Sequence, residues 1–458
     1  MKKKRIGIVA FDYRLGFQPL TINSALMLER EGYEIHIFID TPSYEESKIN
    51  FGGFGDKNIT THPIDRRDSP RDAAPTSGRT GSFNATADVL LRTLPGHGAT
   101  LRSLYRQTVS LYWNLYLMFY QAFYNRGSPN EKRNKLTYDF FPALFDFQEK
   151  VAQSIGDEYV CLLGIDENGL IAATMAAEND SHERRTPVIY FNMELLLKRY
   201  ARTLHTKVLN SIERSCVTSC YCVVIQDEKR AAHFLADTKL PQEKLVYLPV
   251  SGLRAEYRGK SNYFRELFEI SPDTRILLYA GAIEDFGMCV ELAEAANNWG
   301  DDLVLVMHSP LAPEAIHFHG AYVDMVKRAA RGNKVYLSLN PVQWEKLPEL
   351  ISSGDIWLMF YKGKQPNLYE IGQSSNKLVQ YLQVGLPIIT IDFPSLKKIT
   401  QGCRCGESAH SPDEIEALAR RIIASYDVYR NHAFECYETR YRITDYFDNL
   451  LERIRLIE

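Results

Sequence analysis

The sequence predicts an α/β protein made of two doubly wound parallel-sheet domains. The chain has 458 residues, enough for two or three domains at about 150 residues each. Hydrophobic residues make up 45% of it and charged residues 24%, an ordinary globular composition. Both halves alternate short apolar runs with helical stretches, which favours parallel sheets covered by helices. Disordered, collagen-like and simple-repeat proteins are excluded.

The first predicted unit is a strand, a loop, a helix and a second strand. Ile6–Phe11 is apolar, and Leu20–Glu31 has the spacing of a helix that Gly32 ends. Tyr33–Ile39 is the next strand. Strands joined in this way run parallel, and parallel sheets bind ligands beyond the carboxyl ends of their strands. The loop after the first strand, Asp12–Pro19, is therefore expected to line a ligand site.

A surface excursion and an aromatic helix follow. Arg66–Thr100 is rich in Gly, Ser, Thr, Pro and Arg and is expected on the surface, within an insertion around residues 65–135. Leu101–Tyr124 is predicted as a helix rich in aromatic residues. Because apolar side chains run around much of it, burial against the domain or a second copy is favoured. A helix lying on a membrane surface stays open as an alternative.

The rest of the chain repeats the alternation of strands and helices. Strands in the first half are expected at Tyr159–Gly164, Thr186–Phe191, Cys222–Gln226 and Lys244–Val250, with helices at Leu195–Cys216 and Glu228–Ala236. Strands in the second half are expected at Arg275–Ala280, Leu303–His308, Val335–Leu339, Ile356–Phe360 and Pro387–Ile391. Helices between and after them are expected at Cys289–Asn297, Ala321–Ala330, Trp344–Ile351, Asn376–Val384 and from Ser411 to Ala424.

These elements predict two Rossmann-like domains that face a cleft. The N-terminal domain is expected to span residues 1–252 and the C-terminal domain residues 253–430. A long amphipathic helix, about Ala433–Ile457, ends the chain. The segment 431–458 that carries it is expected to pack back on the N-terminal domain.

Charge and cysteine content exclude further classes. The chain has 57 acidic and 54 basic residues, whereas a nucleic-acid-binding domain would be basic. Its eight cysteines are too few for a disulfide scaffold, so we expect reduced cytosolic thiols, with a zinc site as the weaker alternative. The start does not resemble a signal peptide, and the most apolar stretch, Gln107–Asn125, is too polar to span a membrane. A cytoplasmic location is predicted.

The clearest motif is SSNKLVQYLQVGLPII, residues 374–389, in which a small-residue loop leads into a helix and a glycine and a proline begin the next strand. Helix amides bind anions, and a lysine adds a full positive charge. An anion site is therefore expected at Ser374, Ser375, Asn376 and Lys377. The motif resembles the donor site of GT-B fold glycosyltransferases, particularly the family 4-like enzymes (glycosyl transferases group 1). In that family the site neutralises a departing nucleoside diphosphate.

Other segments fit the same family pattern. Leu278–Ile283 resembles its first C-domain strand and glycine loop, which places Gly281 and Ala282 near the donor phosphates. Further candidates for contacts with the nucleotide, the sugar or the acceptor, each in a loop at a strand end or near the donor loop, are Gly16, His308 and Glu370.

The sequence also departs from the family. Many family 4 enzymes carry two glutamates eight positions apart, and the matching positions here are Gly372 and Gln380. Cations often found around the glycine loop are replaced by Ala282 and Phe286. The stereochemical outcome, retaining or inverting, is therefore left open.

A transferase also needs a group that deprotonates the acceptor hydroxyl. Glu194 and Asp12 each follow a predicted strand, at the carboxyl edge of the sheet where ligands bind. Both are candidate catalytic bases. Each is also placed to cap a helix or turn, which remains the competing interpretation.

The resemblance implies a metal-independent, cytoplasmic glycosyltransferase of polysaccharide biosynthesis that uses no cofactor. It would move a sugar from a UDP- or GDP-linked donor to a glycan, lipid-linked or small-molecule acceptor. Stacking of the aromatic helix on sugar rings, or its contact with the inner face of a membrane, stays open as an alternative to the favoured burial. A homodimer stays open, and no nucleic-acid partner is expected. The chain lacks both G-x-G-x-x-G after its first strand and a Walker sequence, which disfavours nicotinamide and P-loop enzymes. The alternatives are a sugar-nucleotide epimerase of the same fold and a non-catalytic partner of an active transferase.

Overall fold

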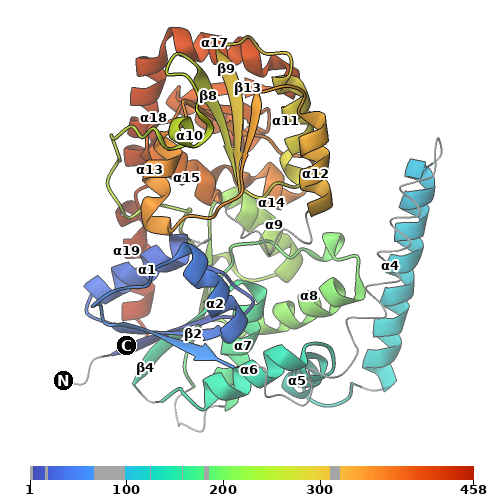
Figure 1. Cartoon of the computed structure of the whole chain (residues 1–458). Helices are drawn as coiled ribbons and strands as arrows, with labels where there is room; N and C mark the ends of the chain where they lie inside the picture. Colours follow the sequence, from blue (N-terminus) through green and yellow to red (C-terminus); the bar gives the residue numbers. More distant parts are fainter. Residues whose placement is uncertain are drawn as a thin grey trace.

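The computed structural model describes residues 4–15, 19–65, 98–123, 125–156, 158–179, 185–309 and 320–458. It has two lobes, one above the other, each built on a parallel sheet with helices on both faces (Figure 1). The first sheet has the order β3-β2-β1-β4-β5-β6-β7 and the second β10-β9-β8-β11-β12-β13. The predicted pair of doubly wound domains is confirmed.

The strands of the first sheet are β1 (Arg5–Ala10), β2 (Glu34–Asp40), β3 (Ile59–Ile64), β4 (Tyr159–Ile165), β5 (Val188–Phe191), β6 (Cys222–Ile225) and β7 (Leu245–Tyr247). Its helices are α1 (Pro19–Arg30), α2 (Thr41–Asn50), α4 (Gly98–Phe123), α5 (Pro129–Phe140), α6 (Pro142–Ala152), α7 (Asp166–Asn179), α8 (Leu204–Val217) and α9 (Glu228–Thr238).

The strands of the second sheet are β8 (Arg275–Ala280), β9 (Leu303–His308), β10 (Val335–Ser338), β11 (Ile356–Met359), β12 (Ile388–Ile391) and β13 (Gly406–Ala409). Its helices are α10 (Tyr263–Phe268), α11 (Cys289–Ala296), α12 (Gly320–Ala329), α13 (Leu347–Ser352), α14 (Pro366–Tyr369), α15 (Asn376–Gln383), α16 (Pro394–Cys403), α17 (Ile415–Ala424), α18 (Tyr426–Arg440) and α19 (Thr444–Arg455).

The strands are apolar without interruption because both faces of each sheet are covered. In β1 successive side chains point to opposite faces. Ile6 and Ile8 join one hydrophobic cluster, which continues into the second lobe. Val9 joins the other cluster, formed with the helices on the opposite face of the first sheet. The continuous run that predicted this strand therefore reflects burial on two sides.

Two short edge strands were absent from the sequence prediction. β3 contains threonines, a histidine and Pro63, and β13 reads Gly-Glu-Ser-Ala. Each lies at an end of its sheet, where one side needs no strand partner and proline or polar residues are tolerated. Their low hydrophobicity is the reason that the apolar pattern did not reveal them.

The final helix is divided, contrary to the single helix expected over 433–457. α18 ends at Arg440 and α19 begins at Thr444. Between them the Gly252 N–H donates to the Tyr441 carbonyl at 2.6 Å, and the Ile443 N–H donates to the Gly252 carbonyl at 3.0 Å. This bridge to the segment that joins the lobes interrupts the helix. α19 then runs down beside the first lobe and contacts α1 and β7 (Figure 1).

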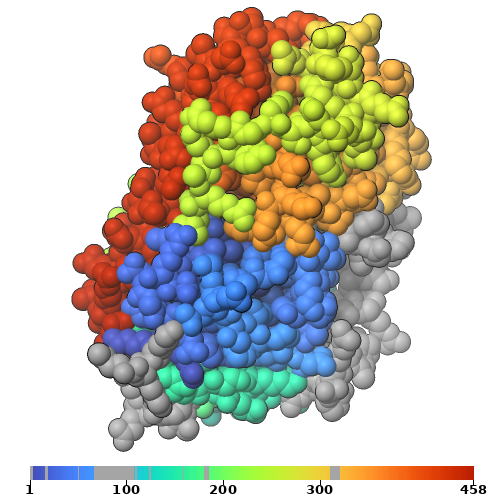
Figure 2. Space-filling view, turned by 60° about the vertical axis from the view of Figure 1, so that its left-hand side comes forward, coloured from blue at the N-terminus to red at the C-terminus, as the bar shows by residue number. Residues whose placement is uncertain are grey.

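The two lobes touch on the face shown in Figure 2, where residues near 345 of the second lobe, in orange, meet the blue N-terminal residues. The Gln343 side chain donates to the carbonyls of Lys48 and Ile49, at 3.0 and 3.1 Å. The rings of Phe51 and Trp344 lie 6.3 Å apart, centre to centre. These contacts hold the carboxyl ends of the two sheets toward each other.

The aromatic helix forms as predicted, but most of its described apolar side chains are not buried against the lobe. Burial against a second copy stays a prediction. α4 stands apart from the lobe at the side of the molecule (Figure 1). Leu111 is 59% exposed and Phe119 is 55% exposed. Lys207 of α8 donates to the Asn114 side chain at 2.7 Å, so one edge of α4 contacts the lobe. Among the described residues, no helix is both long enough and apolar enough to cross a membrane.

The expectation that all eight cysteines are free thiols is also wrong. Cys403 and Cys436 form a disulfide, with their Cα atoms 5.6 Å apart. They lie at the end of α16 and within α18, which pack together, and nothing in their sequence spacing indicates this pairing. Cys405 lies beside them, since the three sulfur atoms are within 4.8 Å of one another.

Candidate functional site

A cavity of about 600 Å³ opens between the lobes, at the carboxyl ends of both sheets. Arg14 and Glu194 line it from the first lobe. The second lobe contributes most of the wall, including Ala280, Gly281, Ala282, Phe286, His308, Tyr361, Ser374, Ser375, Asn376, Lys377 and Gln380. Cavities of this size at the strand ends of α/β sheets are where such proteins bind small molecules.

Lys377 lies at the floor of this cavity, against the glycine loop that follows β8. A Cβ atom on Gly281 would collide with the Lys377 ammonium, so glycine makes room for the lysine. The Lys377 Nζ lies 5.7 Å from the centre of the Tyr279 ring and 5.8 Å from that of Tyr361. Burial lowers the pKa of Lys377 to about 8. No described residue forms an ion pair with it, so a bound anion would supply the missing partner.

The predicted anion-binding turn begins α15, directly beside this lysine. The Ser375 hydroxyl accepts from the Leu378 N–H at 3.2 Å and caps the helix. The Ser374 hydroxyl accepts from Arg230 of the first lobe, also at 3.2 Å. The Ser375 hydroxyl therefore caps its own helix, whereas the Ser374 hydroxyl connects the turn to the other lobe. The positive end of α15 faces the cavity together with Lys377.

His308 ends β9 and reaches the same cavity. It is 1% exposed, and its Nδ1 lies 3.0 Å from the Ser338 hydroxyl. Its Nε2 has no hydrogen-bond partner among the described residues. Burial lowers the pKa of His308 to about 4, which keeps the imidazole neutral at physiological pH. A ligand that offers a hydrogen-bonding group would satisfy Nε2.

Glu194 is the acidic group that the first lobe presents to the cavity. Asp166, in the left-handed conformation at φ 51°, accepts from the N–H groups of Met193 and Glu194 at 2.9 and 3.0 Å. These bonds fix the loop that carries the carboxyl. Although Glu194 is open to the cavity, the surrounding protein raises its pKa, and the nearby Arg230 opposes that rise.

Two predicted site residues are not brought into the cavity, and a third cannot be placed. Asp12 adopts φ 55°, and its N–H donates to Asp40 at 2.7 Å; it is exposed and is not part of the lining. Glu370 is buried and pairs with Lys229 across the lobes, at 3.3 Å. Gly16 lies outside the described residues.

The structure places the positions at which the sequence departs from the expected family pattern. A Cβ atom at Gly372 would lie 2.7 Å from the Ser395 carbonyl oxygen, so no side chain fits there without a backbone shift. Gln380 faces the cavity in place of a carboxylate. Phe286 lines the cavity nearly parallel to Tyr361, with an interplanar angle of 6°. An aromatic wall thus stands at the position where the family pattern predicted a cation.

Sequence reasoning missed Arg230, which lies in the first turn of α9. In the sequence it is one of several charged residues at a helix start, with no motif around it. The fold alone reveals that it is 1% exposed and contacts both lobes. Only an N-cap aspartate, Asp227, marks the turn, and that signal indicates a helix rather than a site.

Comparisons with known proteins identify the fold. No protein-family model and no curated protein sequence matches the chain. Among solved structures it is similar to Anabaena HepE in complex with UDP and glucose, at a TM-score of 0.62 and 10% identity, over 99% of this chain and 100% of that one. It is also similar to the α,α-trehalose-phosphate synthase (UDP-forming) of Burkholderia vietnamiensis, at a TM-score of 0.61 and 10% identity, over 100% of this chain and 98% of that one.

A third similar structure is the sucrose-phosphate synthase of Thermosynechococcus elongatus, at a TM-score of 0.60 and 12% identity, over 99% of both chains. The likeness extends over whole chains, so it includes both lobes and their arrangement. At such low identity it establishes architecture rather than activity. The predicted GT-B fold is confirmed: this chain has the two-lobed architecture of the glycosyltransferases to which it is similar.

Proposed function

We propose that this protein is a glycosyltransferase that moves a sugar from a nucleoside diphosphate to a hydroxyl acceptor. The observation that carries the proposal is Lys377, a partly buried ammonium without an ion-pair partner among the described residues, beside the positive end of α15 in the interlobe cavity. An uncompensated buried charge is costly, and a bound diphosphate would offset that cost.

The proposed chemistry places negative charge at this point. When the acceptor oxygen attacks the anomeric carbon, the bond from that carbon to the diphosphate oxygen breaks, and the diphosphate gains charge. Lys377 and the amide end of α15 would stabilise it before and during departure. Binding of the anion would also raise the pKa of Lys377 above about 8 and hold the lysine charged.

The proposed donor is a UDP-sugar, with a GDP-sugar as the second choice. HepE is described in complex with UDP-glucose and with UDP, and the trehalose-phosphate synthase is described as UDP-forming. In this chain Phe286 would pack against an apolar or aromatic face of the ligand. The free Nε2 of neutral His308 would bond to a hydroxyl of the sugar or ribose.

Glu194 is the proposed base for the acceptor hydroxyl. It is the one carboxylate of the described residues in the cavity lining, and it faces the second lobe from the side where an acceptor would enter. Its raised pKa brings it toward the range in which a general base works at neutral pH. Asp12 is not proposed for this role, because it lies outside the lining.

A binding experiment tests the site. UDP should raise the melting temperature of the wild-type protein by several degrees at concentrations well above its Kd. Lys377→Ala should weaken UDP binding about 10-fold or more in calorimetry, the loss expected for a charge-assisted contact. Lys398→Ala is the matched control, because this exposed lysine lies on α16 outside the lining. Equal UDP affinity in wild type and Lys377→Ala would overturn the proposed site.

Product analysis tests the reaction. With an acceptor, a transferase forms UDP and a glycoside. An epimerase would instead convert the UDP-sugar into an isomer without any acceptor. A protein that neither binds nor consumes UDP-sugars would support the non-catalytic alternative.

A further inference from the structure

Arg230 is a buried guanidinium at the junction of the two lobes. It lies in the first turn of α9, where Asp227 accepts from the N–H groups of Lys229 and Arg230 at 2.8 and 2.9 Å. Its Nη2 donates to the Met193 carbonyl of the first lobe at 2.7 Å. Its Nη1 donates to the Ser374 hydroxyl of the second lobe at 3.2 Å. One rigid, planar group therefore touches both lobes at once.

The charge of Arg230 has no partner in direct contact. Among the described residues no carboxylate lies within ion-pair distance, and the buried Nε has no hydrogen-bond acceptor. The acidic groups that favour its charged form act from farther away, namely Glu194, Asp227, Asp166 and Glu370. A packed apolar side chain would avoid the cost of such burial. Because burial of this charge is unfavourable, its presence here indicates a role that requires the guanidinium itself.

The two groups that Arg230 joins belong to the two halves of the proposed reaction. Ser374 begins the turn that leads into α15 and Lys377. Met193 precedes Glu194 in the loop that Asp166 holds. We propose that Arg230 is a positioning residue that couples these two elements, so that the anion-binding turn and the Glu194 carboxylate are placed relative to each other. This inference rests on the proposed function.

A second contact between the lobes supports the coupling. The Asn367 side chain accepts from the Leu195 N–H at 2.9 Å and donates to the Leu195 carbonyl at 3.2 Å. The loop 193–195 is thus attached to the second lobe at two points, through Arg230 and through Asn367. The loop is therefore bonded both to its own lobe, through Asp166, and to the second lobe, so a shift of one lobe against the other would displace Glu194. A displacement of about 1 Å between reacting groups can cost about 100-fold in rate.

The coupling also has an electrostatic consequence. The charged and titratable groups around Glu194 are Arg230 from α9, Asp166 and Glu167 from the start of α7, and Tyr361 after β11, while Arg14 and Lys377 line the same cavity. Among these cations, Arg230 is the one that lowers the Glu194 pKa. Replacing it with a neutral residue removes the influence that lowers the Glu194 pKa, so the acid limb of a pH–rate profile should move to higher pH. A purely structural role would reduce the rate without moving that limb.

The test uses the full chain with UDP and UDP-glucose. UDP binding is measured by calorimetry, and UDP-glucose turnover, with water as the acceptor, is measured as kcat and KM across pH. Arg230→Gln should lower kcat by about 10- to 100-fold, change the Kd for UDP by less than about threefold, and shift the acid limb upward. Arg230→Lys should leave the acid limb of the pH–rate profile in place, because it keeps the charge. It should recover only part of kcat, because an ammonium lacks the planar, forked N–H donors of the guanidinium.

Lys229→Gln is the matched control. It removes a neighbouring contact between the lobes, the pair with Glu370, but does not touch the loop 193–195. It should behave like the wild type. If Arg230→Gln does not fold, Arg230→Met replaces it, because an apolar side chain of similar length avoids the cost of a buried charge. An acid limb that stays at the wild-type pH in Arg230→Met would overturn the coupling.

The outcomes separate the two proposals. A wild-type protein that binds neither UDP nor UDP-glucose overturns the proposed function, and the coupling falls with it. A wild type that binds and turns over UDP-glucose, beside an Arg230→Gln variant with the same kcat and the same acid limb, overturns the coupling alone.

Discussion

Three carboxyl groups of the first lobe lie in surroundings that oppose their ionisation. Desolvation by the surrounding protein is the largest influence that raises the pKa of Asp166, Glu167 and Glu213. The folded protein therefore holds these protons to higher pH than the unfolded chain, whose carboxyls titrate near 4. The stability that they contribute is complete below that pH and is lost as pH rises toward the folded pKa values.

Glu213 offers a test of this linkage outside the cavity. It is buried, and the Tyr190 hydroxyl donates to its Oε1 at 2.8 Å, a bond that a glutamine can also accept. Glu213→Gln should therefore unfold at higher urea concentration than the wild type at pH 8. The difference should shrink toward pH 4, where the wild-type carboxyl is protonated. Exposed Glu149 provides the control variant, Glu149→Gln, for which no pH-dependent gain is expected. A constant difference between pH 4 and pH 8 would contradict the linkage.

At the level of single residues, the sequence predicted the site residues that a short local motif marks. Lys377 follows two serines at a helix start, a pattern that is visible in the sequence and that the structure places on the cavity wall. Arg230 and the Cys403–Cys436 pair depend on contacts between distant segments. No local pattern encodes such contacts, so sequence reasoning could not find them.

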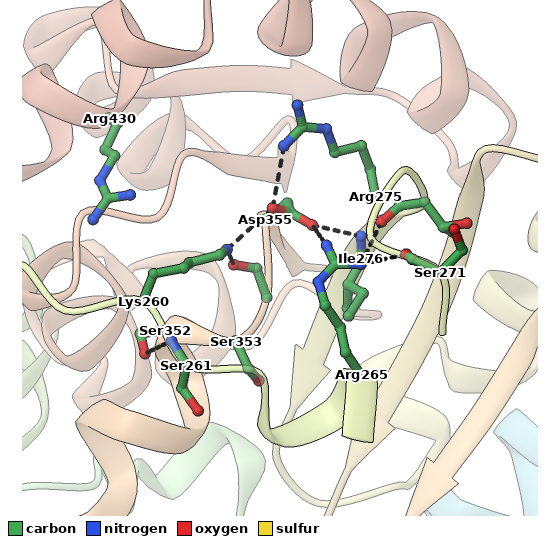
Figure 3. Close-up of polar contacts among 12 residues, drawn as sticks. Lys260, Ser261, Arg265, Ser271, Arg275, Ile276, Ser352, Ser353, Asp355 and Arg430 are labelled. Carbon is green, nitrogen blue, oxygen red and sulfur yellow. Dashed lines mark hydrogen bonds and ion pairs between the residues drawn. The ribbon is translucent and has the colours of Figure 1, made fainter. Parts of the chain in front are cut away.

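Elements of the second lobe are joined by a single buried carboxylate. Asp355 precedes β11, is 1% exposed, and accepts from the Ile276 N–H of β8 at 2.8 Å. Lys260, Arg265 and Arg275 converge on the same carboxylate, at 3.0, 3.0 and 3.5 Å (Figure 3). One side chain thus ties the segment after the lobe junction to α10 and to two neighbouring strands.

Removal of this charge should destabilise the lobe strongly. Asp355→Asn leaves three cations beside a neutral group, of which Arg265 is the most covered, and loss of a buried partner from an ionic cluster costs about 3–5 kcal/mol. The free energy of unfolding in urea measures the effect. Asp301→Asn is the control, because that carboxylate is fully exposed and its pair with Lys334 should contribute about 1 kcal/mol or less. Similar values for the two variants would show that Asp355 does not hold these elements together.

Elements were predictable where one residue pattern dominates. The central strands and α15 follow from apolar runs and helix signals, and all of them are present. β13 carries too few apolar residues to stand out. α4 shows the opposite difference, since its apolar residues predicted burial while several of the described ones, such as Leu111 and Phe119, are exposed in the single chain. Periodicity indicates a helix, but it does not show which other element covers it.

The shape of the whole molecule depends on the contacts that fix the two lobes relative to each other. No local sequence pattern encodes these contacts. Alternating strands and helices predicted two domains and a cleft between them. The contacts that set the cleft join residues far apart in the chain, such as Gln343 with Lys48 and Asn367 with Leu195. The return of the chain end to the first lobe is another such contact, made by α19.

α19 should make the two lobes unfold as one unit. Its buried face, Phe447, Leu450, Leu451 and Ile454, lies toward α1 and β7, and Arg455 pairs with Glu31 at 2.9 Å. Deletion of residues 444–458 removes several core side chains, each worth about 2–5 kcal/mol. Calorimetry should show one transition for the full chain and, for the truncated chain, two, with the first lobe melting earlier. Leu456→Ser is the control, because Leu456 is 69% exposed and should leave the single transition unchanged. One transition at the wild-type temperature after truncation would mean that the lobes are coupled by the cavity contacts alone.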